Sequence, residues 1–301
     1  VLSLTFENDT CASADRYYTG GLRIAWQSPA TRSAVLNGVG KALAPWLLPA
    51  DAEIGWGVSI SQSIFTSRKR LVPDPPRDDH PYAGHLAGAF TLTAASADSL
   101  GVIELSLGVI GPSSGAEETQ ELAHHLLDRR RIRGWDRQLD DRPAGLLVAE
   151  RRWHRPLATL PGGLELGVVP AVGLHLGNVQ TSAAGGALFR IGRRLAMDFG
   201  PPRVRPALSG LGIFRPPEGF GWSLFGGVEG RAVAYQETLA GNRDGYWRIQ
   251  REPLVAEVPL GFALAYGPAR LGFTWVLQTR TFDEQPDAWH RFGSATFSLA
   301  F

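Results

Sequence analysis

The sequence contains no long hydrophobic segment. Within its 301 residues, no run approaches the roughly 18 to 20 apolar residues that a transmembrane helix requires. It holds a single cysteine, Cys11, which excludes an internal disulfide, and no pattern that would activate a thiol accompanies it. Neither sign of charge is in excess, because 30 Lys and Arg residues balance 29 Asp and Glu residues. These absences argue against a helical membrane protein, a cysteine enzyme and a protein that binds nucleic acid.

An initiator methionine is also missing, and the chain opens on residues 1–6, Val-Leu-Ser-Leu-Thr-Phe, which alternate as a strand does. This start predicts that a targeting segment has been removed and that the sequence is the mature form of an exported protein.

What the sequence does contain is long rows in which large apolar residues alternate with small or polar ones. Residues 254–266, 270–280 and 291–301 each place their large apolar side chains on one face, and the last row ends on an aromatic residue, Phe301. A soluble sandwich also alternates, but its core-facing rows are seldom this long, with aromatic residues near the row ends. The pattern therefore predicts strands of a transmembrane β-barrel.

Twelve such strands can be placed along the chain. They fall near residues 1–8, 18–28, 52–63, 83–95, 100–110, 144–154, 164–176, 184–194, 221–235, 252–265, 270–280 and 291–301. An even number of strands brings both termini to the periplasmic side of a bacterial barrel. The predicted fold is all-β: a single domain over residues 1–301, a twelve-stranded antiparallel transmembrane β-barrel of the Gram-negative outer membrane, with a short helical insertion at about 111–143 in an extracellular loop.

Loop lengths agree with this topology at most positions, since periplasmic turns are usually short and extracellular loops longer. The predicted periplasmic turns include residues 96–99, 155–163 and 266–269. The predicted extracellular loops include residues 64–82, 111–143, 236–251 and 281–290. Two segments disagree, because 29–51 and 195–220 should be periplasmic turns yet each has about twenty residues or more, and the first is partly helical in pattern over 35–47.

Polar residues converge on the predicted extracellular rim. Asn8 and Asp9 end the first strand, Thr19 begins the second, and residues 78–80 and His124 lie in the second and third outer loops. A histidine near carboxylates can act as a general base on water, and Asp, Asn or Glu oxygens can hold Ca²⁺, which polarises an ester carbonyl. Hydrolysis of an ester needs both components.

The insertion presents its histidine on a polar helix face. At 100° per residue, one face collects Glu117, Gln120, Glu121, His124 and Asp128. Each signal alone also has an ordinary explanation, because a histidine on a loop helix is usually a solvated surface residue and acidic residues often cap a helix start. Asn8-Asp9 is likewise common where a strand turns, and nothing supports a catalytic role for His125 beyond its position next to His124. The polar residues together favour a functional site because they all lie on the same predicted rim.

Six ordered motifs resemble the lipid A 3'-O-deacylase family of Gram-negative outer membranes. They occupy residues 4–9, 15–22, 61–66, 79–84, 111–124 and 134–139. The resemblance implies a twelve-stranded barrel with its active site between the barrel wall and the insertion helix, near the outer leaflet. It also implies a Ca²⁺-dependent hydrolysis that removes the 3'-linked acyloxyacyl group of lipid A. The expected partner is therefore lipid A, the lipid part of lipopolysaccharide, in the outer leaflet.

Carried onto this sequence, the resemblance makes His124 the general base, with Asp9 and Asn8 orienting it or binding Ca²⁺, and Thr19 lining the pocket. Asp128 is a further candidate metal ligand. Arg68, Lys69 and Arg70 are candidate contacts to a substrate phosphate. We expect direct attack by water without an acyl-enzyme, in a monomer.

The main alternative is a passive porin or structural barrel whose rim is stabilised by Ca²⁺. A porin should show a charged lumen along many strands, whereas the predicted inward faces here are mostly Gly, Ser, Thr and Ala. The scattered exceptions are Glu165, Glu229, Arg231 and Glu257. This composition favours a narrow, filled interior. A secretion barrel that carries a passenger is a third interpretation, but it needs a helix through the lumen at the N-terminus, where this sequence has a strand.

Overall fold

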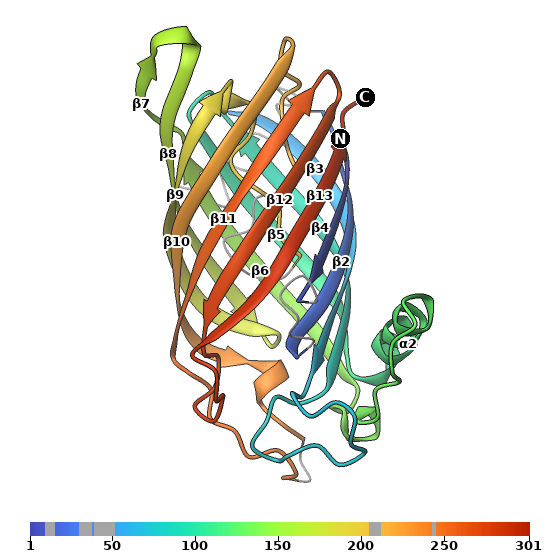
Figure 1. Cartoon of the computed structure of the whole chain (residues 1–301). Helices are drawn as coiled ribbons and strands as arrows, with labels where there is room; N and C mark the ends of the chain where they lie inside the picture. Colours follow the sequence, from blue (N-terminus) through green and yellow to red (C-terminus); the bar gives the residue numbers. More distant parts are fainter. Residues whose placement is uncertain (10–15, 30–37, 39–51, 205–211, 243–244) are drawn as a thin grey trace.

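The computed structural model describes residues 1–9, 16–29, 38, 52–204, 212–242 and 245–301, and it shows a single antiparallel β-barrel (Figure 1). In the described residues no helix is long and apolar enough to cross a membrane. The strands are β1 (Leu2–Asn8), β2 (Tyr17–Gln27), β3 (Glu53–Thr66), β4 (Ala83–Ala95), β5 (Ser99–Ile110), β6 (Arg142–Trp153), β7 (Arg155–Leu160), β8 (Leu164–Gly177), β9 (Gln180–Arg193), β10 (Phe220–Gln236), β11 (Leu254–Tyr266), β12 (Ala269–Thr279) and β13 (Trp289–Leu299).

Twelve of these strands close the barrel, which confirms the predicted fold. Each pairs antiparallel with its neighbours in the sequence, β1 pairs with β13, and β6 pairs with β8 to complete the ring. The short β7 is the exception: it pairs with β8 and forms a hairpin that projects from the end of the barrel where both termini lie (Figure 1). The predicted turn at 155–163 is therefore a strand followed by the short helix η4 (Pro161–Gly163).

Side chains alternate along the strands with apolar groups outward and polar groups inward. On β1, Leu2, Leu4 and Phe6 are about half exposed at the barrel surface, whereas Ser3 and Thr5 are buried in the lumen. This is the reverse of a water-soluble barrel, and it suits a wall that faces lipid.

The described part of 195–220 is not a turn. After the short helix η5 (Leu195–Met197), the chain enters the lumen, and we call residues 198–204 and 212–214 the plug. Arg203 of the plug donates to Glu7 of β1 at 2.9 Å and to Glu257 of β11 at 3.2 Å. The overlong turn expected from the strand count is thus an internal plug, whereas 29–51 lies outside the described residues except for positions 29 and 38.

A second ion-pair cluster holds the plug at its start. Asp198 pairs with Arg190 of β9 at 3.1 Å and with Arg270 of β12 at 2.7 Å, and all three side chains are almost completely buried. A buried charge that loses its partner costs about 3–5 kcal/mol, so these contacts fix the plug relative to the wall. Their residues are far apart in the sequence, which explains why local patterns did not reveal them.

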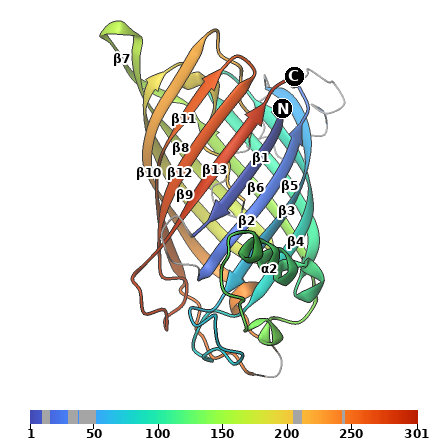
Figure 2. The same ribbon diagram turned by 45° about the vertical axis from the view of Figure 1, so that its right-hand side comes forward.

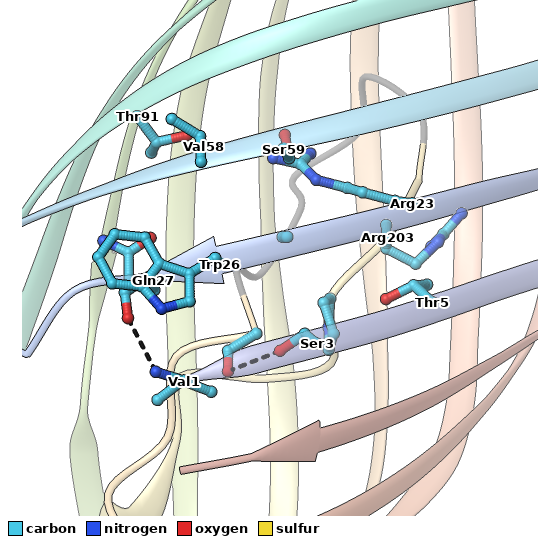
Figure 3. A pocket seen from close by; sticks show the side chains of 13 residues that line it. Val1, Ser3, Thr5, Arg23, Trp26, Gln27, Val58, Ser59, Thr91 and Arg203 are labelled. Carbon is cyan, nitrogen blue, oxygen red and sulfur yellow. Dashed lines mark hydrogen bonds between the residues drawn. The ribbon is translucent and has the colours of Figure 1, made fainter. Parts of the chain in front are cut away.

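The space left around the plug is small. Two cavities flank Arg203, and each has a volume of about 20 Å³, enough for roughly one water molecule. Figure 3 shows one of them, with Arg203 beside Thr5 and Ser3 of β1 and Arg23 of β2. Ser3 Oγ also donates to the main-chain oxygen of Gly212 at 3.4 Å.

The outer end of the barrel is packed with aromatic rings. His80, in the loop after β3, stacks on Phe65 at 5.4 Å between centroids and meets Phe282 edge-on at 5.9 Å. Burial lowers the pKa of His80 to about 4, although its hydrogen bond to Pro81 and the nearby Asp79 act in the opposite direction. The ring is therefore neutral at physiological pH, as an apolar cap requires.

We expect the barrel to carry no steady ionic current in a planar bilayer, because the plug and the outer cap fill the lumen. Deleting residues 198–217, which leaves a short connection between β9 and β10, should open a conducting path. A steady conductance through the intact chain, equal to that of the deletion variant, would contradict the filled lumen.

Candidate active site

The helix α2 (Ala116–Leu126) lies against the outside of the barrel, near the end opposite the termini and in front of β2 to β4 (Figure 2). Gly84 of β4 allows this close approach, since a Cβ at that position would lie 1.9 Å from Ser114 Oγ and 2.3 Å from the Cβ of Ala116. The short helix η2 (Pro112–Ser114) precedes α2, and Gly115 joins the two in the left-handed conformation at φ 65°. Glycine at positions 84 and 115 is thus a steric requirement of the docking of α2.

Two side-chain hydrogen bonds hold η2 and α2 in place. Trp135, at the start of η3 (Trp135–Arg137), donates from Nε1 to Gln120 Oε1 at 3.1 Å, and Gln62 of β3 donates to the main-chain oxygen of Ser114 at 2.7 Å. The Trp135 ring also packs edge-on against Tyr82 at 5.2 Å. These contacts give structural roles to several of the motif residues.

A cavity of about 360 Å³ lies between α2 and the barrel wall. Its walls come from β1, β2, β3, α2 and the residues just after α2. They are Phe6, Asn8, Thr19, Gly20, Gly21, Leu22, Gln62, Ile64, Thr119, Gln120, Ala123, His124, Leu127 and Arg129. Most of this lining is apolar, and it is continuous with the lipid-facing surface of the strands, so the cavity suits an acyl chain.

Thr19 reaches this cavity because β2 is irregular. The pairing of β2 with β3 shifts register between Tyr18 and Gly20, which makes Thr19 the extra residue of a bulge. Tyr18 points inward and donates from its hydroxyl to Glu7 Oε2 at 2.6 Å, whereas Thr19 Oγ1 lies 2.6 Å from Thr66 Oγ1. Regular alternation would have placed Thr19 on the luminal face with Gly21.

His124 is held by the chain that follows its own helix. Asp128 adopts a left-handed conformation at φ 50°, which turns the backbone back on itself, and His124 Nδ1 then lies 2.8 Å from the main-chain oxygen of Arg130. A carbonyl oxygen can only accept, so Nδ1 carries the proton and Nε2 is the basic nitrogen. The imidazole is buried and lines the cavity.

The cavity brings together three of the predicted site residues: Asn8, Thr19 and His124. Asp9 is fully buried one position beyond Asn8, and its Oδ2 accepts the main-chain N–H of Arg16 at 2.5 Å; it does not line the cavity. Asp128 is exposed at the end of α2 and is also outside the lining. The catalytic and metal-binding roles of all five residues stay predictions.

The candidate phosphate contacts Arg68, Lys69 and Arg70 lie in the loop after β3 and outside the cavity lining. Arg68 donates its main-chain N–H to Asp79 Oδ2 at 3.0 Å. The sequence reasoning missed Arg129, which lines the cavity beside His124. A run of three arginines directly after the helix was the available signal.

Glu117, the first acidic residue on the predicted polar face of α2, is partly buried and does not line the cavity. Burial and the neighbouring carboxylates of Glu121, Glu118 and Asp136 raise its pKa. Among the residues that the structure describes, no three His, Cys, Asp or Glu side chains form a group suited to a metal ion. A cation at this rim would thus depend on amide, hydroxyl and main-chain oxygens as well as carboxylates.

The bulge predicts which thiols can be labelled from outside. In a Cys11→Ser background, a Thr19→Cys variant should react with a small methanethiosulfonate reagent through the cavity. A Thr5→Cys variant, whose side chain faces the filled lumen, should react much more slowly. Equal protection of both thiols, measured by mass, would place Thr19 in the lumen and contradict the bulge.

Comparisons with known proteins agree with this architecture. The family model described as outer membrane protein LpxR matches residues 1–301. Among solved structures, LpxR from Salmonella typhimurium aligns with a TM-score of 0.82 at 20% sequence identity, over 100% of this chain and 99% of that chain. The β domain of the Bordetella autotransporter BrkA aligns over 100% of this chain and 97% of that chain, with a TM-score of 0.49 at 11% identity.

A comparison with curated protein sequences returned no match. The Salmonella structure bears on the fold, and the family assignment rests on the model that covers every residue. The chain therefore belongs to the LpxR outer membrane protein family, and it is a β-barrel of the Gram-negative outer membrane.

Proposed function

We propose that this barrel is a lipid A deacylase that hydrolyses the ester of the 3'-linked acyloxyacyl group in the outer leaflet. The observation that carries the proposal is the position of His124: a buried imidazole with a defined tautomer lines an apolar cavity on the lipid-facing side of the wall. Membership of the LpxR family supports lipid A as the substrate. The proposed enzyme acts as a monomer.

The proposed reaction is a direct hydrolysis. His124 Nε2 removes a proton from water, and the oxygen attacks the ester carbonyl carbon to give a tetrahedral oxyanion. As the bond from the carbonyl carbon to the sugar oxygen breaks, the imidazolium returns the proton to that oxygen. The products are a free acyloxyacyl acid and a sugar hydroxyl group. The Nδ1–H bond to the Arg130 carbonyl keeps the imidazole in the required tautomer throughout.

Calcium is the proposed cofactor, and the donors at the barrel side of the cavity fit a hard cation in part. Asn8 and Thr19 supply oxygen atoms to the lining, and the Asp9 carboxylate is the next residue along the chain. Ca²⁺ takes six to eight oxygen ligands, so main-chain, water and substrate oxygens would complete the set. When bound, the ion would polarise the ester carbonyl and lower the energy of the oxyanion. Asp128 would have to move to join these ligands.

A passive porin is the second candidate, and the filled lumen argues against it. Arg203 and Asp198 tie the plug to four different strands, β1, β9, β11 and β12. The cavity that contains the polar residues lies between α2 and the barrel wall, so it is not part of a path through the lumen.

Replacing the base tests the proposal. Lipid A in detergent should lose an acyloxyacyl group when incubated with the refolded barrel, and His124→Ala should lower the rate by about 10²- to 10⁴-fold. His125→Ala is the matched control, because His125 lies on the same helix, is exposed and does not line the cavity; its rate should be unchanged. Products are identified by mass. Equal rates for wild type and His124→Ala would remove His124 as the base.

Removing the cation tests the second component. A chelator should lower the rate by about 100-fold, which corresponds to the loss of one electrostatic contact to the oxyanion, and added Ca²⁺ should restore it. In Asn8→Ala, half-maximal activity should require a higher Ca²⁺ concentration. Activity that is insensitive to chelation would exclude a role for Ca²⁺ in the hydrolysis. An unchanged Ca²⁺ dependence in Asn8→Ala would exclude Asn8 as a ligand.

A further inference from the structure

Two basic loop segments meet beside the mouth of the cavity. The chain after α2 carries four arginines within residues 129–133, and the main-chain N–H of Arg133 donates to the oxygen of Arg70 at 2.9 Å. This contact joins the segment to the loop after β3. We call the joined cations the basic rim; its members are Arg68, Lys69, Arg70, Arg129, Arg130, Arg131 and Arg133. All except the half-buried Arg70 are exposed.

Arg129 is the rim residue that enters the cavity lining. Its main-chain N–H donates to the main-chain oxygen of His124 at 2.8 Å, so the turn that holds the imidazole also fixes the position of Arg129. Among the residues that the structure describes, the lining of the cavity includes no carboxylate side chain. Arg129 thus brings a positive charge to the wall that also carries the proposed base.

Arg131, two residues after Arg129, forms an ion pair with α2. Its Nε lies 2.5 Å from Glu121 Oε1 of α2, and this pair is exposed to solvent. Arg131 is thus paired with a residue of α2, and it is not among the residues that line the cavity, whereas Arg129 is.

We propose that Arg129, with the basic rim around it, binds a phosphate group of the glycolipid whose acyl chain occupies the cavity. A guanidinium presents parallel N–H donors that match phosphate oxygens, and the exposed rim adds longer-range attraction for the same charge. The apolar part of the lining, including Phe6, Leu22 and Leu127, contacts the acyl chain of the same molecule. Phosphate on Arg129 and acyl chain in the cavity would fix the scissile ester beside His124. The inference rests on the proposed function.

Free inorganic phosphate is the other source of the same chemistry, and the surroundings favour the lipid. A free anion would contact Arg129 but leave the adjoining apolar wall unused, whereas a phosphoglycolipid uses both. The two sources also differ in how they respond to an acyl chain, which makes them separable by experiment.

Binding is measured without turnover in a His124→Ala background, with detergent micelles that contain either phosphorylated lipid A or its dephosphorylated form. Arg129→Gln should weaken binding of the phosphorylated lipid by roughly tenfold, as expected for a partly solvated charge-assisted pair. It should leave binding of the dephosphorylated lipid unchanged. Arg129→Lys, which keeps the charge but not the paired donors, should fall between the two. Arg248→Gln is the matched control, because Arg248 is exposed in an outer loop and does not line the cavity.

Three results would overturn the proposal. An equal loss of binding for both lipids in Arg129→Gln would mean that Arg129 acts through packing, and no loss for either would mean that it does not bind phosphate. Equal wild-type affinity for the two lipids, together with binding of inorganic phosphate that Arg129→Gln abolishes, would indicate a free-anion site. Heat-modifiable migration in electrophoresis confirms that each variant has folded; if Arg129→Gln does not fold, Arg129→Lys carries the comparison.

A kinetic comparison with His124 intact distinguishes this inference from the proposed function. Arg129→Gln should raise KM for phosphorylated lipid A by a similar factor and leave kcat nearly unchanged. An absence of hydrolysis by the wild type would overturn the deacylase proposal alone, since the binding measurement needs no turnover. Hydrolysis with no phosphate preference in the wild type would overturn the phosphate site alone.

Discussion

Inside a bilayer, every backbone N–H and C=O has to find its partner within the protein, because hydrocarbon offers none. The pairing of β1 with β13 and of β6 with β8 meets this requirement by leaving no open edge in the ring. Closure then fixes the side-chain pattern, since each strand must turn one face to lipid and the other to the lumen. The buried carboxylates of Glu7 and Glu257 line a narrow lumen and need positive partners, which Arg203 of the plug and Arg231 of β10 supply.

The candidate active site depends on places where this regularity is interrupted. Thr19 reaches the cavity because of a bulge, and Gly84 removes a side chain from the wall so that α2 can approach. His124 obtains its tautomer from a carbonyl of the residues that follow its helix. None of the three devices changes the ring of strands, so the wall supplies rigidity while local irregularities supply chemistry.

The sequence was informative where structure is periodic and local. Alternation at a period of two located all twelve barrel strands within a few residues, and the ordered motifs indicated that α2 and the first two strands share a site. Alternation alone would have turned Thr19 into the lumen, because a bulge reverses the face of a residue without any change in composition, and it was the family resemblance that put Thr19 in the pocket. The sequence could not foresee the plug, because the pairing of Arg203 with Glu7 joins positions 196 residues apart in the chain. Asp9 and Arg129 illustrate the same limit: adjacency to a motif does not tell which side chain enters the cavity.

The cavity on the outer surface of the wall has a consequence for the traffic of molecules under the proposed function. A substrate that enters between α2 and the strands arrives by lateral diffusion within the leaflet, and the freed acyl chain can leave by the same route without crossing water. The filled barrel then meets its substrate by two-dimensional diffusion within the leaflet. The encounter rate is set by the mobility of the lipid and by its surface density.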